Sequence, residues 1–260
     1  SHNQMTLQPL ITEGGKILIL DVSQLGLAQN TQKKSSGFLK SIVPDPTEAC
    51  DPIIKAGFVP IIVLDPGHGG SDTGIQEHSL LTEKDWTWKL TYQLRLSLIA
   101  TGKFNVVMTR IGDQLRSIDQ RAITANTSQG TAFISFHLSN SRPGKQVVIP
   151  YLYQPPLNST KLDTPEEPSF VSWGEVQNSH LPESLKLAQY LKNEFVQIAN
   201  IEAREPTLAP VRLLQSVNSP AVLIEISNVN SLENRKGNEN SKFILQLAQA
   251  ITRAIKKFSC

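Results

Sequence analysis

Residues 59–70 read VPIIVLDPGHGG, an apolar and β-branched run that stops at Asp65-Pro66-Gly67. A short continuous apolar run bounded by turn residues predicts a strand that is buried on both faces. The next segment, residues 83–101, predicts an amphipathic helix, because large apolar side chains recur there at four-residue steps. These side chains are Trp86, Leu90, Leu94 and Leu98.

Strand-like and helix-like patterns continue to alternate toward the end of the chain. This alternation indicates a mostly parallel, twisted sheet that is covered by helices on both faces. The predicted fold class is therefore α/β, with a single three-layer domain at residues 58–260. The further strands are predicted at 104–109, 131–136, 146–153, 211–215 and 221–226, and the further helices at 115–125, 185–198 and, with Ser241 as N-cap, 241–255.

Two segments lie outside this pattern. Residues 1–57 predict a small N-terminal extension, with a short β-like run at 16–22 and a polar, mobile loop at 29–37, and no chemistry is visible in it. Residues 154–178 contain four prolines and few apolar anchors, which predicts a long loop. Loops of this length in compact domains are usually functional or disordered.

The composition is that of a folded globular protein. Of the 260 residues, 39% are hydrophobic and 18% are charged, which argues against intrinsic disorder. The net charge of +2 is too small to indicate nucleic acid as a partner, and no dense Lys/Arg stripe is visible. No apolar run approaches the roughly 18 residues of a membrane-spanning helix, so no membrane span is expected.

The start of the chain and its two cysteines leave alternatives open. Ser1-His2-Asn3 does not resemble a signal peptide, but a cleaved signal could have preceded it. Cys50 and Cys260 are too few and too far apart for a cysteine-rich zinc site or a disulfide-dense scaffold. The two thiols either form one long-range disulfide or are unrelated.

Four polar residues are predicted near one edge of the sheet. His68 and His137 each follow a predicted strand, Glu83 begins the first helix, and Glu225 lies at the end of a late strand. In open parallel sheets, binding sites form outside the carboxyl ends of the strands. Because the four residues come from distant parts of the sequence, their convergence on this edge predicts a functional site.

Two imidazoles and one carboxylate are a common catalytic zinc set. His68, Glu83 and His137 are therefore predicted to bind one Zn²⁺, which leaves a position for water and lowers the pKa of that water to about 7. Glu225 is the spare carboxylate, able to take a proton and pass it to a leaving amine. Asp65 is expected to accept a hydrogen bond from a ligand imidazole or from loop amides.

Several motifs resemble a known family, the zinc N-acetylmuramoyl-L-alanine amidases of the amidase-3 type. The resemblance covers roughly residues 59–153 and 180–257, and the motifs follow the family's order. In chain order they are Asp65-Pro66-Gly67-His68-Gly69-Gly70, Glu83-Lys84-Asp85, Thr109-Arg110 with Asp113, Arg121-Ala122, Ser135-Phe136-His137-Leu138-Ser139-Asn140 and Ser219-Pro220-Ala221-Val222-Leu223-Ile224-Glu225.

The resemblance implies zinc ligation by His68, Glu83 and His137, with Glu225 as the catalytic base. The implied reaction is hydrolysis of the amide between N-acetylmuramic acid and L-alanine in peptidoglycan, as in an autolysin that serves cell-wall remodelling, cell separation or lysis. We expect a monomer that acts in the periplasm or outside the cell. Peptidoglycan is the expected partner, with a protein activator as a second one.

Two departures from the family pattern lie at the rim of the predicted site. Leu138 stands where the family has a small Ala, and Ile226-Ser227-Asn228-Val229-Asn230 stands where it usually has Gly-Phe and then a Ser-Asn pair. These changes affect the expected substrate preference more than metal binding. Some relatives carry a helix that plugs the zinc site until a partner removes it. Residues 154–178 lie in a comparable place, but their prolines argue against a stable plug helix.

Other charged residues near the motifs have two interpretations each. Arg110, Asp113 and Arg121 would either contact an anionic substrate or form structural ion pairs. Glu77 and His78, between the first two predicted ligands, would either compete for the metal or lie in a solvated loop.

Two rival functions are weighed against the amidase. A catalytically silent wall-binding or regulatory domain could keep the fold, but it would have no reason to keep all four site residues. A zinc carboxypeptidase also uses two His ligands, a Glu ligand and a Glu base. The ligand order and the flanking residues of this chain fit a carboxypeptidase less well.

Overall fold

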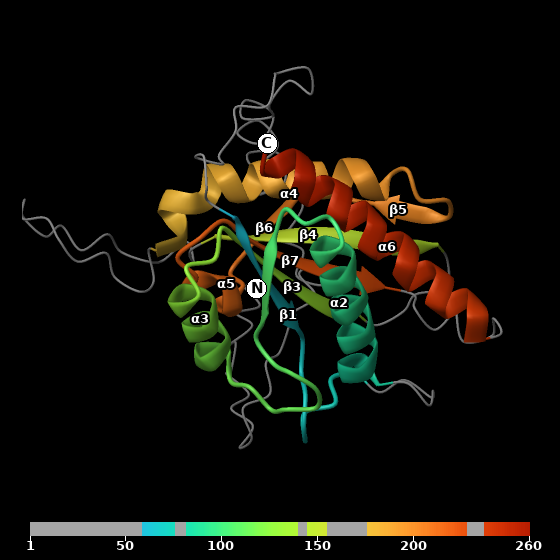
Figure 1. The fold of residues 1–260 in the computed structure, drawn as a ribbon, viewed down its shortest axis with the longest axis horizontal. Helices are drawn as coiled ribbons and strands as arrows, with labels where there is room; N and C mark the ends of the chain where they lie inside the picture. Colours follow the sequence, from blue (N-terminus) through green and yellow to red (C-terminus); the bar gives the residue numbers. More distant parts are fainter. Residues whose placement is uncertain (1–58, 76–81, 140–144, 155–175, 228–236) are drawn as a thin grey trace, which may run out of the picture.

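The computed structural model describes residues 59–75, 82–139, 145–154, 176–227 and 237–260. These residues form an α/β domain whose central sheet has helices on both sides, as predicted (Figure 1). The extension at 1–57 lies outside the described residues, and so does nearly all of the proline-rich segment 154–178. The domain boundary and the role of that segment therefore stay predictions.

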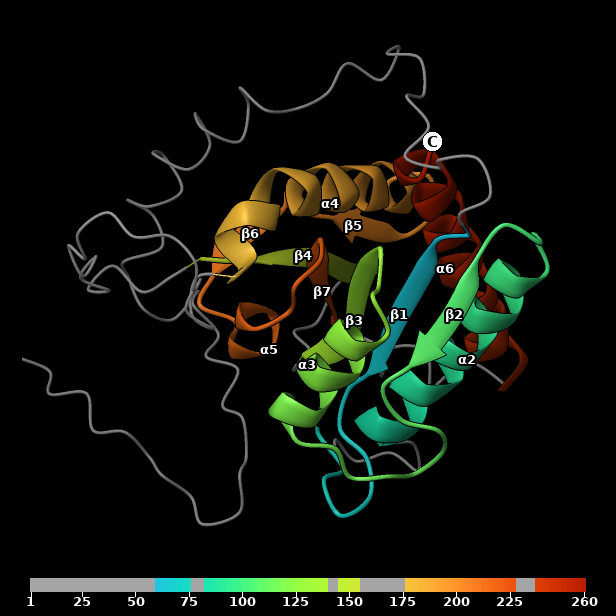
Figure 2. The same ribbon diagram turned by 60° about the vertical axis from the view of Figure 1, so that its left-hand side comes forward.

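The sheet has the strand order β2-β1-β3-β7-β4-β5, with β6 beside β4 (Figure 2). The strands β2, β1, β3 and β7 run parallel to one another, whereas β4 is antiparallel to β7. The carboxyl ends of β1, β3 and β7 therefore share one edge. The strands are β1 Ile61–Pro66, β2 Asn105–Met108, β3 Ala132–Ser139, β4 Gln146–Tyr153, β5 Ile201–Ala203, β6 Thr207–Ala209 and β7 Ala221–Ser227.

The helices cover the two faces of the sheet unequally. Side chains of α2, α4 and α6 join the larger apolar cluster on one face, and those of α3 and α5 join the smaller cluster on the other. Alternate strand residues divide between the clusters: Ile134 and Phe136 of β3 belong to the larger one, Phe133 to the smaller. The helices are α2 Glu83–Ile99, α3 Ile118–Thr127, η2 (3-10) Val176–His180, α4 Leu181–Phe195, α5 Arg212–Gln215 and α6 Gly237–Phe258.

Residues 211–215, predicted as a strand, form the short helix α5 instead. The amide of Leu214 donates to the carbonyl of Val211, which begins a helical turn. This turn brings the consecutive side chains of Leu213 and Leu214 into the same cluster. A strand would send them to opposite faces, so tertiary packing outweighs the β-like composition of the segment.

The predicted starts of three other helices are also wrong. The helix predicted at 185–198 is α4, which begins at Leu181 and ends at Phe195. Leu115 precedes α3 and is 56% exposed, because Ser117 caps that helix in a capping box with Gln120. The last helix, α6, begins at Gly237 rather than at Ser241, which lies inside it.

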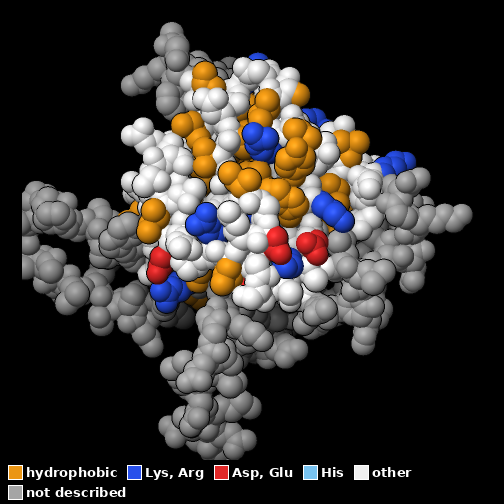
Figure 3. Space-filling model, turned by 60° about the horizontal axis from the view of Figure 1, so that its bottom comes forward, with side chains coloured by type: hydrophobic (Ala, Val, Ile, Leu, Met, Phe, Trp, Pro, Cys, Tyr) orange, Lys and Arg blue, Asp and Glu red, His pale blue; other side chains and the backbone are white. Residues whose placement is uncertain are grey.

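The surface of the domain is mixed in character. On the face drawn in Figure 3, apolar side chains gather near the middle, and Lys and Arg side chains stand singly among them. Among the described residues, α2 exposes Tyr92, Leu96 and Ile99 at 45%, 42% and 44%. None of the described helices is both long and apolar enough to cross a membrane.

Candidate metal centre

The turn after β1 places His68 against β3. The backbone of His68 is in the left-handed region, with φ 60°. The amide of Gly67 donates to the carbonyl of Phe136 at 3.1 Å. A Cβ atom at Gly67 would lie 2.6 Å from Cε1 of His137, so only glycine allows the turn to approach that ring.

His137 and Glu225 are direct partners in the parallel register of β3 and β7. Partners in adjacent strands lie about 4.8 Å apart and present their side chains to the same face. Both residues are buried, with 5% of His137 and 8% of Glu225 exposed. The sequence placed His137 after its strand, whereas β3 extends to Ser139 and includes it.

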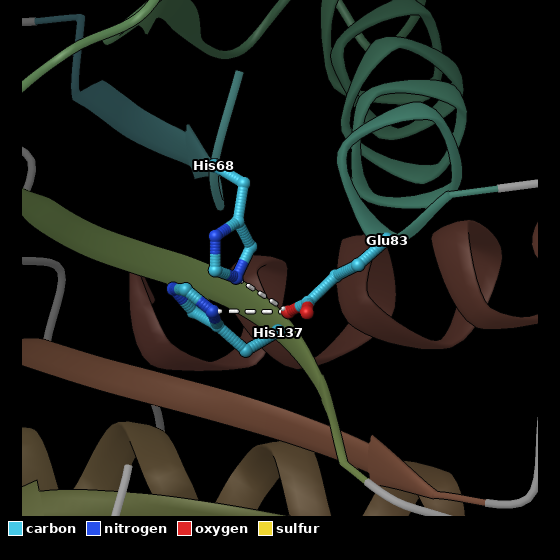
Figure 4. Close-up of side chains that lie close together, drawn as sticks. All are labelled: His68, Glu83 and His137. Atoms are coloured by element: carbon cyan, nitrogen blue, oxygen red, sulfur yellow. Dashed lines mark hydrogen bonds and ion pairs between the residues drawn. The ribbon is translucent and has the colours of Figure 1, made fainter. Parts of the chain in front are cut away.

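The first turn of α2 brings Glu83 between the two imidazoles. Its Oε1 lies 3.0 Å from Nε2 of His68 and 3.2 Å from Nδ1 of His137 (Figure 4). The amide of Leu138 donates to the same oxygen at 2.8 Å, and the amide of Ile75 donates to Oε2 at 2.8 Å. The carboxylate is thus fixed from both sides and aims one oxygen at the histidines.

The spacing of these atoms fits a zinc ion. One ligand atom from each of His68, Glu83 and His137 lies within 4.8 Å of the others. Bonds of about 2.0–2.1 Å in a tetrahedral site separate neighbouring ligand atoms by about 3.3 Å. The two measured nitrogen–oxygen distances, 3.0 and 3.2 Å, agree with that value. Within the described ranges, no other trio of His, Cys, Asp or Glu meets the same criterion.

The electrostatics keep Glu83 ionised. Its burial would raise the pKa of the carboxyl group, but hydrogen bonds and positive charge from His137 and His68 outweigh burial and lower the pKa far below its ordinary value. For His68, burial lowers the pKa of the imidazole, and the contacts with Glu83 and Asp72 outweigh it and raise the pKa. A cation bound to His68 would replace the proton that this imidazole would otherwise hold.

Asp72 orients the ring of His68, a contact that sequence analysis missed. Nδ1 of His68 lies 2.8 Å from Oδ2 of Asp72, which directs Nε2 toward Glu83. Oδ1 of Asp72 accepts from the amide of Gly74 at 3.2 Å. A carboxylate on the second nitrogen of a ligand imidazole fixes the tautomer and the ring orientation. The one sequence signal for this contact is the four-residue distance from His68.

Among the described residues, Asp65 accepts a hydrogen bond neither from a ligand imidazole nor from a loop amide, so that expectation is wrong. It is fully buried and accepts hydrogen bonds from the hydroxyl of Ser135 at 2.6 Å, from NH1 of Arg121 at 2.8 Å and from the hydroxyl of Thr109. These donors belong to β3, α3 and the end of β2. Asp65 therefore ties the strands and α3 together below the site.

The structure favours the structural interpretation of the charged residues around the motifs. Arg110 and Arg121 are 2% and 5% exposed, and their guanidinium groups donate to backbone carbonyls of the turn that carries His68. Asp113 accepts from Nζ of Lys84 and from the amide of Gly70, both at 2.7 Å. The two guanidinium groups are therefore bonded to the backbone, and the carboxylate of Asp113, 58% exposed, is paired with Lys84.

Several other predictions fall on residues outside the described ranges. Glu77, His78 and Cys50 are among these residues, so competition for the metal and a disulfide with Cys260 stay untested.

Comparison with known proteins identifies the family. A family model described as N-acetylmuramoyl-L-alanine amidase (Amidase_3) matches residues 62–257. The N-acetylmuramoyl-L-alanine amidase AmiC of Escherichia coli O6:H1 is 22% identical over 218 residues, which cover 76% of this chain and 52% of AmiC. The chain thus spans about half the length of this relative.

Two solved structures show the same fold. The N-acetylmuramoyl-L-alanine amidase of Clostridium difficile 630 has a TM-score of 0.58 at 25% identity, over 76% of this chain and 95% of that one. The CwlD amidase of Clostridioides difficile, solved in complex with the GerS lipoprotein, has a TM-score of 0.52 at 22% identity, over 76% and 98%. Since the family model covers most of the sequence and the fold agrees with it, the chain belongs to the amidase-3 type of N-acetylmuramoyl-L-alanine amidases.

Proposed function

We propose that the protein is a zinc-dependent hydrolase that cleaves the amide between N-acetylmuramic acid and L-alanine in peptidoglycan. The observation that carries this proposal is that His68 and His137, from two separate segments of the chain, both lie within hydrogen-bond distance of one carboxylate oxygen of Glu83. Membership of the amidase family supports the choice of substrate.

In this proposal, His68, His137 and Glu83 would hold one Zn²⁺, with Nε2 of His68 and Nδ1 of His137 facing the carboxylate of Glu83. The chemistry that zinc supplies is a water of lowered pKa and a Lewis acid for the amide carbonyl. Glu225, beside His137 on β7, takes a proton from the attacking water and passes it to the nitrogen of the leaving L-alanine. The carbon–nitrogen bond breaks, the lactyl group becomes a carboxylic acid, and the stem peptide leaves with a free amine.

The setting of the reaction belongs to the same proposal. A peptidoglycan substrate requires the protein to act in the cell envelope, in the periplasm or outside the cell, where we expect it to be a monomer. A protein activator is the second expected partner. The complex of the CwlD amidase with a lipoprotein supports a search for such a partner.

The test combines zinc content, release of dye-labelled peptidoglycan and analysis of the muropeptides. The wild type should hold about one zinc and release stem peptides with a free L-alanine amine. Glu225→Gln should keep the zinc and lose about 10²–10⁴-fold in rate. Glu202→Gln, an exposed glutamate on β5, is the matched control and should behave as the wild type.

Each rival function predicts a different outcome. Products trimmed at the carboxyl end of the peptide would show a carboxypeptidase. Zinc binding without release of any product, with and without candidate activators, would show a silent domain.

A further inference from the structure

The turn that carries His68 is held by side chains at three consecutive carbonyl oxygens. Nε of Arg110 donates to the carbonyl of Pro66 at 3.0 Å, and NH2 of Arg110 donates to that of Gly67 at 3.1 Å. NH2 of Arg121 donates to the carbonyl of His68 itself at 2.8 Å. A left-handed residue such as His68 persists only where its surroundings over-determine it, and these bonds meet that need.

Arg110 also reaches the segment that carries Glu83. Its NH2 donates to the carbonyl of Lys84 at 2.8 Å, one residue after Glu83 in the first turn of α2. Its NH1 donates to the carbonyl of Gly112 at 2.6 Å, which anchors the group to its own loop. One guanidinium therefore joins the His68 turn to the start of the Glu83 helix.

The two buried arginines differ in this respect. NH1 and NH2 of Arg121 donate to the carbonyls of Pro66 and His68, and NH1 also pairs with Asp65. Among its hydrogen bonds in the described part of the chain, none reaches α2. Of the two candidate ligand segments, Arg121 contacts only the His68 turn, whereas Arg110 contacts both the turn and the start of α2.

Thr87 bridges the same two segments without a charge. Its hydroxyl lies 3.0 Å from the carbonyl oxygen of Gly67 and 3.2 Å from that of Lys84. Thr87 is fully buried. Two side chains therefore connect the His68 turn to the start of α2, the guanidinium of Arg110 and the hydroxyl of Thr87.

Arg110 is a buried cation whose hydrogen bonds within the described ranges go to backbone carbonyls rather than to a carboxylate. All four of its hydrogen bonds in the described residues go to backbone carbonyls, and its guanidinium lies 5.5 Å from the centre of the Trp88 ring. A buried charge is costly unless it is well bonded. The planar guanidinium group can donate to carbonyls on two segments at once. A lysine ammonium is a compact point charge and cannot reproduce this geometry.

We propose that Arg110 is a positioning residue that sets the distance between His68 and Glu83 and thereby the affinity for zinc. The proposal rests on the zinc site proposed above. It assigns no contact between Arg110 and the substrate. It predicts that the loss of the fork moves the two ligand segments relative to each other, while the domain stays folded.

The test measures the zinc dissociation constant of purified chains by competition with a chromophoric chelator, and the visible absorption of the Co²⁺-substituted chains. Arg110→Lys should weaken zinc binding by about 10–100-fold, as is typical for groups that orient metal ligands, and should change the Co²⁺ spectrum. Thr87→Val, which keeps shape and neutrality, should change both quantities less and in the same direction.

Two controls separate positioning from general stability. Arg204→Lys makes the same exchange at a 56% exposed side chain and should leave zinc affinity at the wild-type value. Leu94→Ala removes a fully buried side chain eleven residues beyond Glu83 on α2, about 16 Å along the helix. It should lower the thermal midpoint at least as much as Arg110→Lys, with zinc affinity unchanged.

The outcomes distinguish this proposal from the proposed function. Tight zinc binding by the wild type and an unchanged affinity in Arg110→Lys would overturn the positioning role alone. An equal loss in Leu94→Ala would also overturn it, because the effect would then follow stability. A wild type that binds no zinc would overturn the metal site and the positioning role together. If Arg110→Lys does not fold, the same criteria apply to Thr87→Val.

Discussion

The two faces of the sheet carry side chains of different character, although the same strands supply both. On the face covered by α2, α4 and α6, the strand side chains are apolar, for example Ile134 and Ile224, and they lie in the larger cluster. On the opposite face, the apolar cluster under α3 and α5 is small. Toward the carboxyl edge the same alternate positions become Asp65, His137 and Glu225.

This contrast shows how one sheet separates stability from chemistry. The apolar face removes large side chains from water, and each buried Leu or Phe contributes about 1.5–3 kcal/mol. At the carboxyl edge every buried carboxylate needs donors, and Asp65 on the polar face and Glu83 at the start of α2 each receive at least three. Variants on the polar face should therefore act through unpaired charge or lost metal, and variants on the apolar face through packing alone.

The largest change in stability is expected from Asp65→Asn. The variant leaves Arg121 buried without its ionised partner, which typically costs about 3–5 kcal/mol. Urea unfolding at neutral pH measures this change. Asp113→Asn is the control, because Asp113 is exposed and its pair with Lys84 is accessible to water. A loss below about 1 kcal/mol in Asp65→Asn would contradict the importance of this buried network.

Leu94→Ala should cost about 2–5 kcal/mol of stability, because it opens a cavity in the larger cluster. Calorimetry of the zinc-free chain measures the loss. Zinc affinity should not follow it, since the site lies at the other end of α2. A parallel fall in zinc affinity would show that the two faces are not independent.

Asp72→Asn should affect the metal rather than the fold. The variant weakens the hydrogen bond that orients His68, so zinc affinity should fall by about 10–100-fold. Because Asp72 is 40% exposed, the zinc-free chain should keep its stability within about 0.5 kcal/mol. Chelator competition and thermal unfolding measure the two effects, and an unchanged affinity would leave Asp72 without the assigned role.

The smallest effect is expected at Glu194, which joins α4 to α6 through Arg253 and Lys257. Burial raises the pKa of Glu194, but these two cations outweigh burial and lower the pKa. The carboxylate therefore stabilises the fold above its unfolded pKa, about 4.3, and this contribution disappears as pH falls through the lower folded value. Glu194→Gln should lose about 0.5–1 kcal/mol at pH 7, since both partners are half exposed.

Urea midpoints at pH 7 and pH 3 check this sign. The difference between wild type and Glu194→Gln should shrink at the lower pH. A difference that grows on acidification would mean that the folded state does not lower the pKa of Glu194.

The sequence predicted most of the fold because its buried strands and amphipathic helices have clear periodicities. β1, β3, β4 and β7 and the helix α2 lie close to their predicted positions, and α4 overlaps most of its predicted range. The strand predicted at 211–215 failed because a five-residue segment has no periodicity long enough to separate strand from helix. The short strands β5 and β6 were not predicted, since three residues each leave no recognisable pattern.

By itself, the sequence predicted the candidate ligands, because two histidines at the carboxyl ends of parallel strands and a glutamate at the start of the helix after the first strand are expected at one edge of the sheet. Only the tertiary structure decided the supporting contacts: Asp72 on His68, Asp65 on Arg121, and Arg110 between the turn and α2. The physical reason is that the ability to bind a metal depends on the residue type, which the sequence gives directly. These supporting hydrogen bonds depend instead on which polar groups the fold brings within about 3 Å of a side chain.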